Sequence, residues 1–253
     1  MGVLQALVIA FAMYSKIPMP PVAWNEKNMK YTLCYFPLVG AVIGLLSYLG
    51  ASLCQWSHMH TFFTAVCLTL LPIFVTGGIH MDGFIDTVDA LSSQASREKK
   101  LEILKDAHVG AFAIIFAVAY FLAYVAVFTE FSWEALPVFA FAFIMIRTLS
   151  GLSVVCFPLA KNTGLAATFQ DRAHKKRVAW ILLLLFVLEL ALVLCLDWLY
   201  GLVTVGVLLL MFGYHDWLCR KKFGGITGDL AGYFLQMSEL AVAFALMVVA
   251  KVS

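Results

Sequence analysis

The chain has 253 residues, of which 63% are hydrophobic and only 13% are charged. A soluble domain has about a quarter charged residues, so the composition excludes an ordinary soluble protein and predicts an integral membrane protein built as one helical domain over residues 1–253. The formal net charge of +2 gives no indication of nucleic-acid binding, and the six scattered cysteines are expected to be small buried hydrophobes rather than disulfides or zinc ligands.

Apolar runs of about 20 residues predict transmembrane helices. Residues 2–14 form an apolar segment that is short for a span and lacks the features of a cleaved signal peptide, and whether it crosses the bilayer stays open. Prolines in the turn at 15–20 end it. We expect an all-α polytopic bundle with about seven or eight membrane-embedded helices, and the clearer spans are 31–54, 60–75, 109–128, 135–159, 178–196, 199–213 and 230–249.

Two further patterns concern how these spans are arranged. Gly40 and Gly44 form a GxxxG pair, which we expect to support close packing within the chain rather than dimerisation. Lysine and arginine concentrate at 16–30, 97–105, 161–177 and 220–222. The positive-inside rule places such loops in the cytoplasm. Acidic residues near positions 82, 106 and 229 would then share one side of the membrane and could build one site.

The most informative stretch is residues 77–89, which follows the apolar run 60–75. Asp82, Asp86 and Asp89 are spaced i, i+4 and i+7, so a helix would place all three on one face. Three close carboxylates repel one another unless a cation lies between them. Oxygen ligands suit a hard cation, and Mg²⁺ is the usual one where phosphates are handled. The alternative is a solvated first helical turn, with Asp82 as the N-cap behind Gly77 and Gly78.

Two other segments could contribute to the same site. Lys105 could neutralise a phosphate and Asp106 could ligate a metal, although an ordinary interfacial pair is the alternative. Residues 224–229 are rich in glycine and precede the last span, as in phosphate-binding helix N-termini. They lack the P-loop sequence, and the alternative is a flexible turn in which Asp229 is only the N-cap.

Charged residues inside apolar spans are costly and need a partner or a wet cavity. Arg147 and Glu189 could pair with each other, or Arg147 could face a polyphosphate, and Glu239 in the last span raises the same question.

Three motifs then coincide: Gly-Gly-x-His-x-Asp-Gly-x-x-Asp-Thr-x-Asp at 77–89, Lys-Asp-x-x-x-Gly at 105–110 and Gly-Gly-x-Thr-Gly-Asp at 224–229. Together with the proline turn at 15–20 they resemble the adenosylcobinamide-GDP ribazoletransferase family, also called cobalamin-5'-phosphate synthase, over about residues 10–240. The sequence departs from the family pattern at Ala90, at His108, where arginine is usual, and at Gln236, where glutamate is common.

The resemblance implies a multi-pass enzyme of the bacterial inner membrane, with its active site on the cytoplasmic side. It would join adenosylcobinamide-GDP to α-ribazole or α-ribazole 5'-phosphate, release GMP and require Mg²⁺. The implied metal ligands are Asp82, Asp86 and Asp89, and Asp229 joins them as a catalytic residue. The implied substrate-binding residues are His80, Lys105, Asp106, Arg147, Gly225, Thr227 and Gly228.

The chemistry leaves several points open. Either Asp89 or Asp229 could accept the proton of the attacking hydroxyl, and the number of metal ions, the phosphorylation of the acceptor and the formation of a homo-oligomer are undecided. An ion-coupled transporter is one alternative function, but the acids cluster at one edge and no inverted repeat is visible. A CDP-alcohol-type lipid phosphotransferase is another, but residues 82–86 lack the Ala-Arg of that family's motif.

Overall fold

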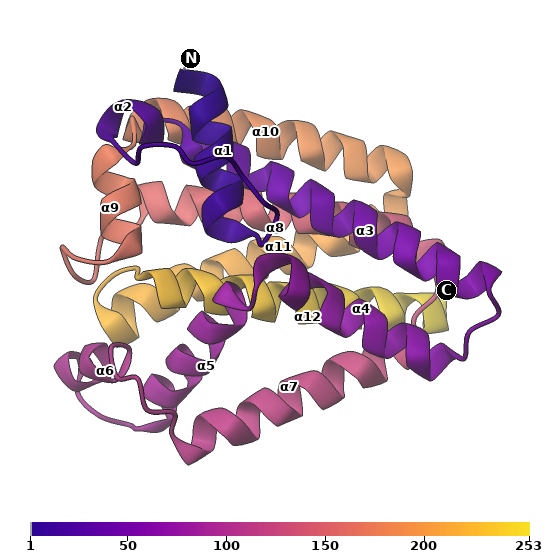
Figure 1. The fold of residues 1–253 in the computed structure, drawn as a ribbon. Helices are drawn as coiled ribbons and strands as arrows, with labels where there is room; N and C mark the ends of the chain where they lie inside the picture. The colour runs from indigo at the N-terminus through magenta and orange to yellow at the C-terminus, as the bar shows by residue number, and fades with distance from the viewer. Residues whose placement is uncertain (1) are drawn as a thin grey trace.

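The computed structural model describes residues 2–253, and these residues form a bundle of helices (Figure 1). The only β pairing among them is an isolated parallel bridge between Leu159 and Ile226. The longer helices are α1 (Gly2–Tyr14), α3 (Phe36–Trp56), α4 (Thr61–Thr76), α5 (Ile79–Ser92), α7 (Ala111–Thr129), α8 (Leu136–Cys156), α10 (Lys175–Leu196), α11 (Trp198–Leu218) and α12 (Gly228–Val252). The shorter ones are α2 (Glu26–Met29), α6 (Arg97–Ile103) and α9 (Leu165–Arg172), with a π-helical turn at Cys219–Phe223.

Six helical segments of the described chain are long and apolar enough to cross a membrane: 26–56, 111–129, 133–156, 175–196, 198–223 and 228–252. The pair α4 and α5 could form a seventh span that bends by 98°, whereas the apolar part of α1 is shorter. These helices confirm the predicted polytopic bundle and indicate a multi-pass membrane protein.

A double-glycine corner separates α4 from α5. Gly77 and Gly78 have φ angles of 66° and 82°, in the left-handed region that only glycine adopts easily. The amide of Gly78 donates to the carbonyl of Ile73, as in a common helix C-terminal motif. The N-cap of α5 is Gly78, so the alternative in which Asp82 caps this helix is wrong.

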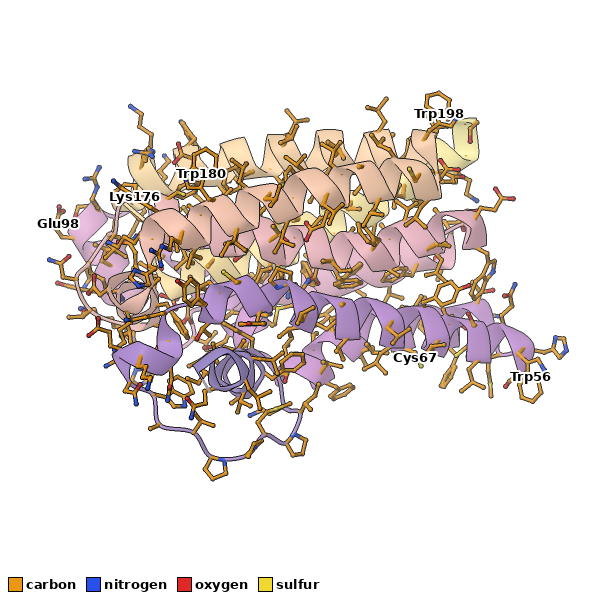
Figure 2. The ribbon with its side chains drawn as sticks, turned by 90° about the horizontal axis from the view of Figure 1, so that it is seen from above. Trp56, Cys67, Glu98, Lys176, Trp180 and Trp198 are labelled. Carbon is orange, nitrogen blue, oxygen red and sulfur yellow. The ribbon has the colours of Figure 1, made fainter. Side chains whose placement is uncertain are left out.

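The basic segments gather at one end of the bundle. Helices α2, α6 and α9 all lie at the end of the bundle opposite the C-terminus (Figure 1). Seen from above, Lys176 and Glu98 lie at this end, whereas Trp56 and Trp198 lie at the other (Figure 2). The arrangement agrees with the alternation of basic and uncharged loops along the sequence.

The GxxxG pair brings α3 and α8 into close contact. A methyl group on Gly40 would collide with the carbonyl of Phe143, and one on Gly44 with the carbonyl of Ala140. The pair therefore serves packing within the chain, as predicted.

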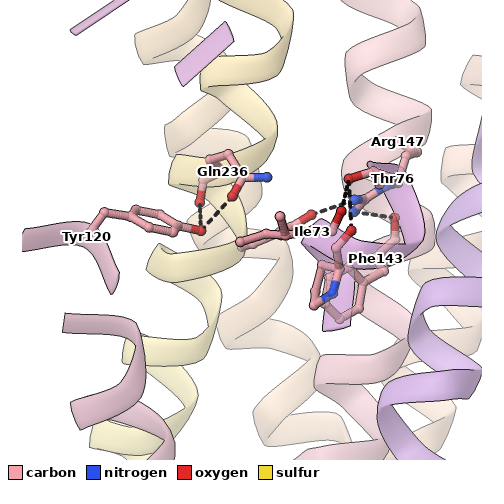
Figure 3. Close-up of polar contacts among 8 residues, drawn as sticks. Ile73, Thr76, Tyr120, Phe143, Arg147 and Gln236 are labelled. Atoms are coloured by element: carbon pink, nitrogen blue, oxygen red, sulfur yellow. Dashed lines mark hydrogen bonds and ion pairs between the residues drawn. The ribbon is translucent and has the colours of Figure 1, made fainter. Parts of the chain in front are cut away.

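An ion pair lies deep inside the bundle. Arg147 on α8 and Glu239 on α12 are 2.6 Å apart, and both side chains are at most 1% exposed. Arg147 also donates to the carbonyl of Phe143, 3.4 Å away (Figure 3). Glu189 on α10 instead accepts a hydrogen bond of 2.7 Å from the hydroxyl of Thr148. The alternative in which Arg147 pairs with Glu189 is wrong, because successive residues of α8 face different helices.

A second buried polar contact lies on the same helix as Glu239. Tyr120 on α7 donates to the side-chain carbonyl of Gln236, 2.9 Å away (Figure 3). Gln236 and Glu239 are three residues apart and so lie about one turn apart on α12. One stretch of α12 therefore supplies polar partners to two neighbouring helices.

Removing one member of the deep ion pair should destabilise the bundle strongly. We expect Glu239→Ala to lower the free energy of unfolding by about 3–5 kcal/mol, because it leaves the Arg147 charge buried without a partner. The matched control is Glu130→Ala, which breaks an equally short pair with Lys251 that is more than half exposed and should cost about 1 kcal/mol or less. Thermal unfolding in detergent measures both, and equal losses would contradict the structural role assigned to Arg147 and Glu239.

Candidate functional site

A cavity of about 200 Å³ opens beside the first turns of α5 and α12. Its polar lining comes from α5, α12 and the loop that follows α8, and includes Asp82, Asp229, Lys161, Thr163 and Thr227. Its apolar lining comes from α1, α3, α8, α9 and α12. The loop after α8 is one of the basic segments, so the polar side of the cavity lies at the basic end of the bundle.

Glycines allow α5 and α12 to touch through their backbones. A Cβ atom at Gly83 would lie 2.8 Å from the carbonyl oxygen of Asp229, and one at Gly232 would lie 2.9 Å from the carbonyl oxygen of His80. This contact brings Asp82 and Asp229 together although they are far apart in the sequence. Both line the cavity, and their charges interact.

The acidic face of α5 is helical, as the i, i+4, i+7 spacing predicts. Asp82 is exposed, and Asp86 and Asp89 are half-buried one and two turns further along. The charges of Asp82, Asp89 and Asp229 all act on the carboxylate of Asp86. This repulsion is a cost that a divalent cation, which prefers oxygen ligands, would relieve.

No group of three or more His, Cys, Asp or Glu side chains among the described residues is already arranged to hold a metal ion. The carboxylate of Asp89 accepts a hydrogen bond of 3.2 Å from the amide of Gly110, at the start of α7, and neither Asp86 nor Asp89 lines the cavity. Mg²⁺ commonly takes only one or two carboxylates and completes its shell with waters and substrate phosphates. The acids therefore fit a cation that arrives with a phosphate.

Asp229 is not the N-cap of α12, a role that the sequence left open for it. The N-cap of α12 is Thr227, whose hydroxyl accepts a hydrogen bond of 3.2 Å from the amide of Leu230. The same hydroxyl lies 3.2 Å from a carboxylate oxygen of Asp229, to which it donates. The cap-only alternative for Asp229 is wrong, and its carboxylate faces the cavity from the first helical turn.

The glycine-rich turn before α12 is less open to phosphate than its composition suggests. The amide of Gly225 donates to the carbonyl of Cys219 at 2.9 Å, and that of Ile226 donates to the carbonyl of Pro158 at 2.7 Å. A side chain at Gly225 would collide with residues 158–160. Gly225 therefore serves close backbone packing, and its predicted substrate contact stays a prediction. Gly228 lines the cavity at a helix N-terminus, where first-turn amides are unpaired.

Lys105 and Asp106 lie on the exposed loop between α6 and α7 and do not line the cavity. Asp106 pairs with His108, whose ring nitrogen Nδ1 is 2.7 Å from the carboxylate. Hydrogen bonds from the His108 amide and imidazole hold the pKa of Asp106 below its usual range. Neither residue contacts the cavity, so the structure does not bring them into the site.

Arg147 does not contact the cavity either. It is fully buried, and its charge is neutralised by Glu239. The predicted substrate contact of Arg147 therefore stays a prediction, and in this structure the side chain is paired inside the bundle.

His80 lies in the cavity wall and is only 4% exposed, yet neither ring nitrogen has a hydrogen-bond partner. A buried imidazole without a partner is unfavourable unless a ligand supplies one. The rings of Tyr14 and Phe36 lie beside it and Phe169 packs against Tyr14, with ring centroids 4.2–6.1 Å apart in these pairs.

Sequence reasoning missed Lys161 and this aromatic group as cavity residues. The charge of Lys161 acts on Asp229, and its position at the start of a basic loop directly after an apolar span was the only signal for it. The three aromatic residues come from separate helices, α1, α3 and α9, and no local pattern in the sequence connects them.

The cobalamin-5-phosphate synthase family model matches residues 6–247. An adenosylcobinamide-GDP ribazoletransferase from Lachnoclostridium phytofermentans is 43% identical, covering 97% of this chain and 94% of the relative. Proteins of the same name from Clostridium botulinum strain Alaska E43 and Geobacillus thermodenitrificans are 29% and 31% identical, with 95% and 92% of this chain and 96% and 91% of the relatives covered. No solved structure matches. The match over nearly the whole chain shows that this protein belongs to the cobalamin-5-phosphate synthase family.

Proposed function

We propose that this protein is an adenosylcobinamide-GDP ribazoletransferase that joins adenosylcobinamide-GDP to α-ribazole or α-ribazole 5'-phosphate and releases GMP, with Mg²⁺ as its cofactor. The observation that carries the proposal is the meeting of Asp82, Asp229 and Lys161 in one cavity of a chain that belongs to this family. The names of the relatives support the same reaction.

The reaction is a phosphoryl transfer, which needs charge neutralisation and alignment more than covalent help. The oxygen of a ribose hydroxyl forms a bond to the phosphorus that carries the cobinamide, the bond from that phosphorus to the GMP phosphate breaks, and the hydroxyl proton leaves. Of the two candidates we assign this proton to Asp229; its position in the cavity lining supports the choice, whereas Asp89 is hydrogen-bonded to Gly110 outside the cavity.

Lys161 and the first turn of α12 would hold the diphosphate. The ammonium group of Lys161 offers a positive charge beside Asp229, and Gly228 offers a backbone amide at a helix N-terminus. Thr227 would orient Asp229 through their hydrogen bond. These residues would keep the reacting phosphorus near the acceptor hydroxyl and the proton acceptor.

Asp82 and Asp86 are the residues that would hold Mg²⁺, because they occupy successive turns of one helix face. The cation, when bound, supplies neutralisation of the charge that develops on the leaving phosphate. We further propose that the protein lies in the bacterial inner membrane with this cavity on the cytoplasmic side, as the basic loops at the same end of the bundle support.

The direct test is to incubate the purified protein in detergent or membranes with adenosylcobinamide-GDP, α-ribazole and Mg²⁺ and to measure GMP. We expect GMP and the joined cobalamin product in equal amounts, and no GMP when α-ribazole is omitted or Mg²⁺ is chelated. GMP release that does not depend on α-ribazole would indicate a hydrolase and would contradict the transferase assignment.

Asp82→Asn should abolish turnover while leaving the protein folded. Asp82 is exposed at the cavity and makes no contact needed for packing, and losing a charged ligand should lower the rate by about 10²-fold or more. The measurement is GMP release across a Mg²⁺ titration, with thermal unfolding as the folding control. Near-normal turnover at limiting Mg²⁺ would refute the metal-binding role.

Asp229→Asn should reduce turnover by about a hundredfold, through loss of a proton acceptor, without lowering stability. Thr227→Ala is the matched variant for helix capping, and removing this cap should cost about 0.5–2 kcal/mol. Steady-state rates and unfolding curves for the two variants separate the roles. An Asp229→Asn protein with normal kcat, or with a stability loss like that of Thr227→Ala, would show that this carboxylate is structural.

A further inference from the structure

The cavity has two chemically different parts. Asp82, Asp229 and Lys161 form a charged edge, whereas Tyr14, Phe36 and Phe169 with His80 form a second part that we name the aromatic wall. Leu33, Val154 and Leu235 continue the apolar surface beside that wall. A ligand that fits both parts must have a charged or hydroxylated end and a flat apolar end.

The aromatic wall contains a buried imidazole that has no hydrogen-bond partner. Tyr14 contacts Phe36 at a centroid distance of 4.2 Å, and His80 lies 5.8 Å from Phe36 and 6.1 Å from Tyr14. Both nitrogens of His80 are buried without a partner. A neutral imidazole has one N–H donor and one acceptor, so the wall is suited to a flat ring whose edge carries very few polar atoms.

We propose that the aromatic wall binds the base of α-ribazole and that His80 donates a hydrogen bond to the free ring nitrogen of that base. The inference rests on the proposed function and assigns one of its two substrates to one part of the cavity. The base is a dimethylbenzimidazole, a flat bicyclic ring with an apolar methylated edge and a single free nitrogen acceptor. Stacking on aromatic side chains suits its faces, and His80 suits its one polar atom.

The other base in the reaction, guanine, fits this wall poorly. Its edge carries a carbonyl oxygen, a ring N–H and an amino group, and each would need a partner once removed from water. Among the residues that line this part of the cavity, only His80, Ser150 and the Tyr14 hydroxyl are polar. The guanosine end of the larger substrate is therefore assigned elsewhere, and the wall selects the ribazole.

The assignment also orients the acceptor, α-ribazole, with its base at the aromatic wall and its ribose toward the charged edge. His80 and Asp82 both line this one cavity, so the base and the ribose of one nucleoside can reach from the wall to the charged edge. The ribose hydroxyl would then lie beside Asp229, which the proposed reaction requires.

The test measures binding of α-ribazole to the purified protein by calorimetry, without Mg²⁺ or the nucleotide substrate. His80→Leu should weaken binding roughly tenfold to a hundredfold, the range for losing a buried hydrogen bond, and His80→Gln should restore part of it because an amide can donate. Phe169→Leu should also weaken binding. The matched control is Phe139→Leu, since Phe139 is equally buried but does not line the cavity.

Turnover supplies the second readout. In the His80 and Phe169 variants the KM for α-ribazole should rise while the KM for adenosylcobinamide-GDP stays within about twofold. Wild-type affinity for α-ribazole in both variants, or a selective rise in the KM for adenosylcobinamide-GDP, would overturn the assignment. If wild-type protein releases GMP but the variants keep wild-type affinity for α-ribazole, the aromatic-wall inference fails and the proposed reaction stands. If wild-type protein binds α-ribazole through His80 yet forms no product, the proposed reaction fails instead.

Discussion

The direct backbone contact between α5 and α12 is the constraint on which the site depends. Gly83 and Gly232 let the two helices approach until the backbone of one touches the other, and a side chain at either position would separate them. The contact lies within the first turns of both helices, where Asp82 and Asp229 are found. Carboxylates that would otherwise avoid each other are thus held at one cavity, and their repulsion is a cost that a bound cation can offset.

The approach of α5 requires the corner that precedes it. A continuous helix through residues 61–92 would carry the acids along the line of α4, whereas Gly77 and Gly78 turn the chain by 98°. Lys16 covers this corner: its backbone amide donates to the carbonyl of Val75, and a methyl group on Gly77 would collide with its side chain. The same proline-rich turn follows Tyr14, so the segment that closes the corner also places part of the aromatic wall.

Sequence patterns predicted the features that depend on local chemistry. Hydrophobic runs located the spans to within a few residues, and the i, i+4, i+7 spacing located the acidic face of α5. The distribution of lysine and arginine predicted that residues 82 and 229 lie at one end of the bundle. Partners across helices were not predictable in this way: Arg147 could have faced Glu189 or Glu239, and only the rotation of α8 decides between them. The packing role of Gly225 was not predictable for a related reason, because a glycine needed for close packing and one needed for phosphate look alike in sequence.

Helix α12 connects the core to the cavity. Asp229 lies in its first turn, and Glu239 lies ten residues further along, about 15 Å deeper at the rise of an α-helix. The deeper carboxylate is paired with Arg147 and fixes the axial position and rotation of α12 against α8. The carboxylate of the first turn accepts a hydrogen bond from Thr227 and lies near the charges of Lys161 and Asp82, and it has no buried ion-pair partner, so it remains available to a substrate. Because α12 is a rigid helix, the position that the Arg147–Glu239 pair gives to its middle also fixes its first turn. The buried ion pair thereby determines where Asp229 lies relative to α5. Charged side chains that are paired inside the protein, such as Arg147 and Glu239, position the helices. Charged side chains without such a partner at the basic end of the bundle form the site.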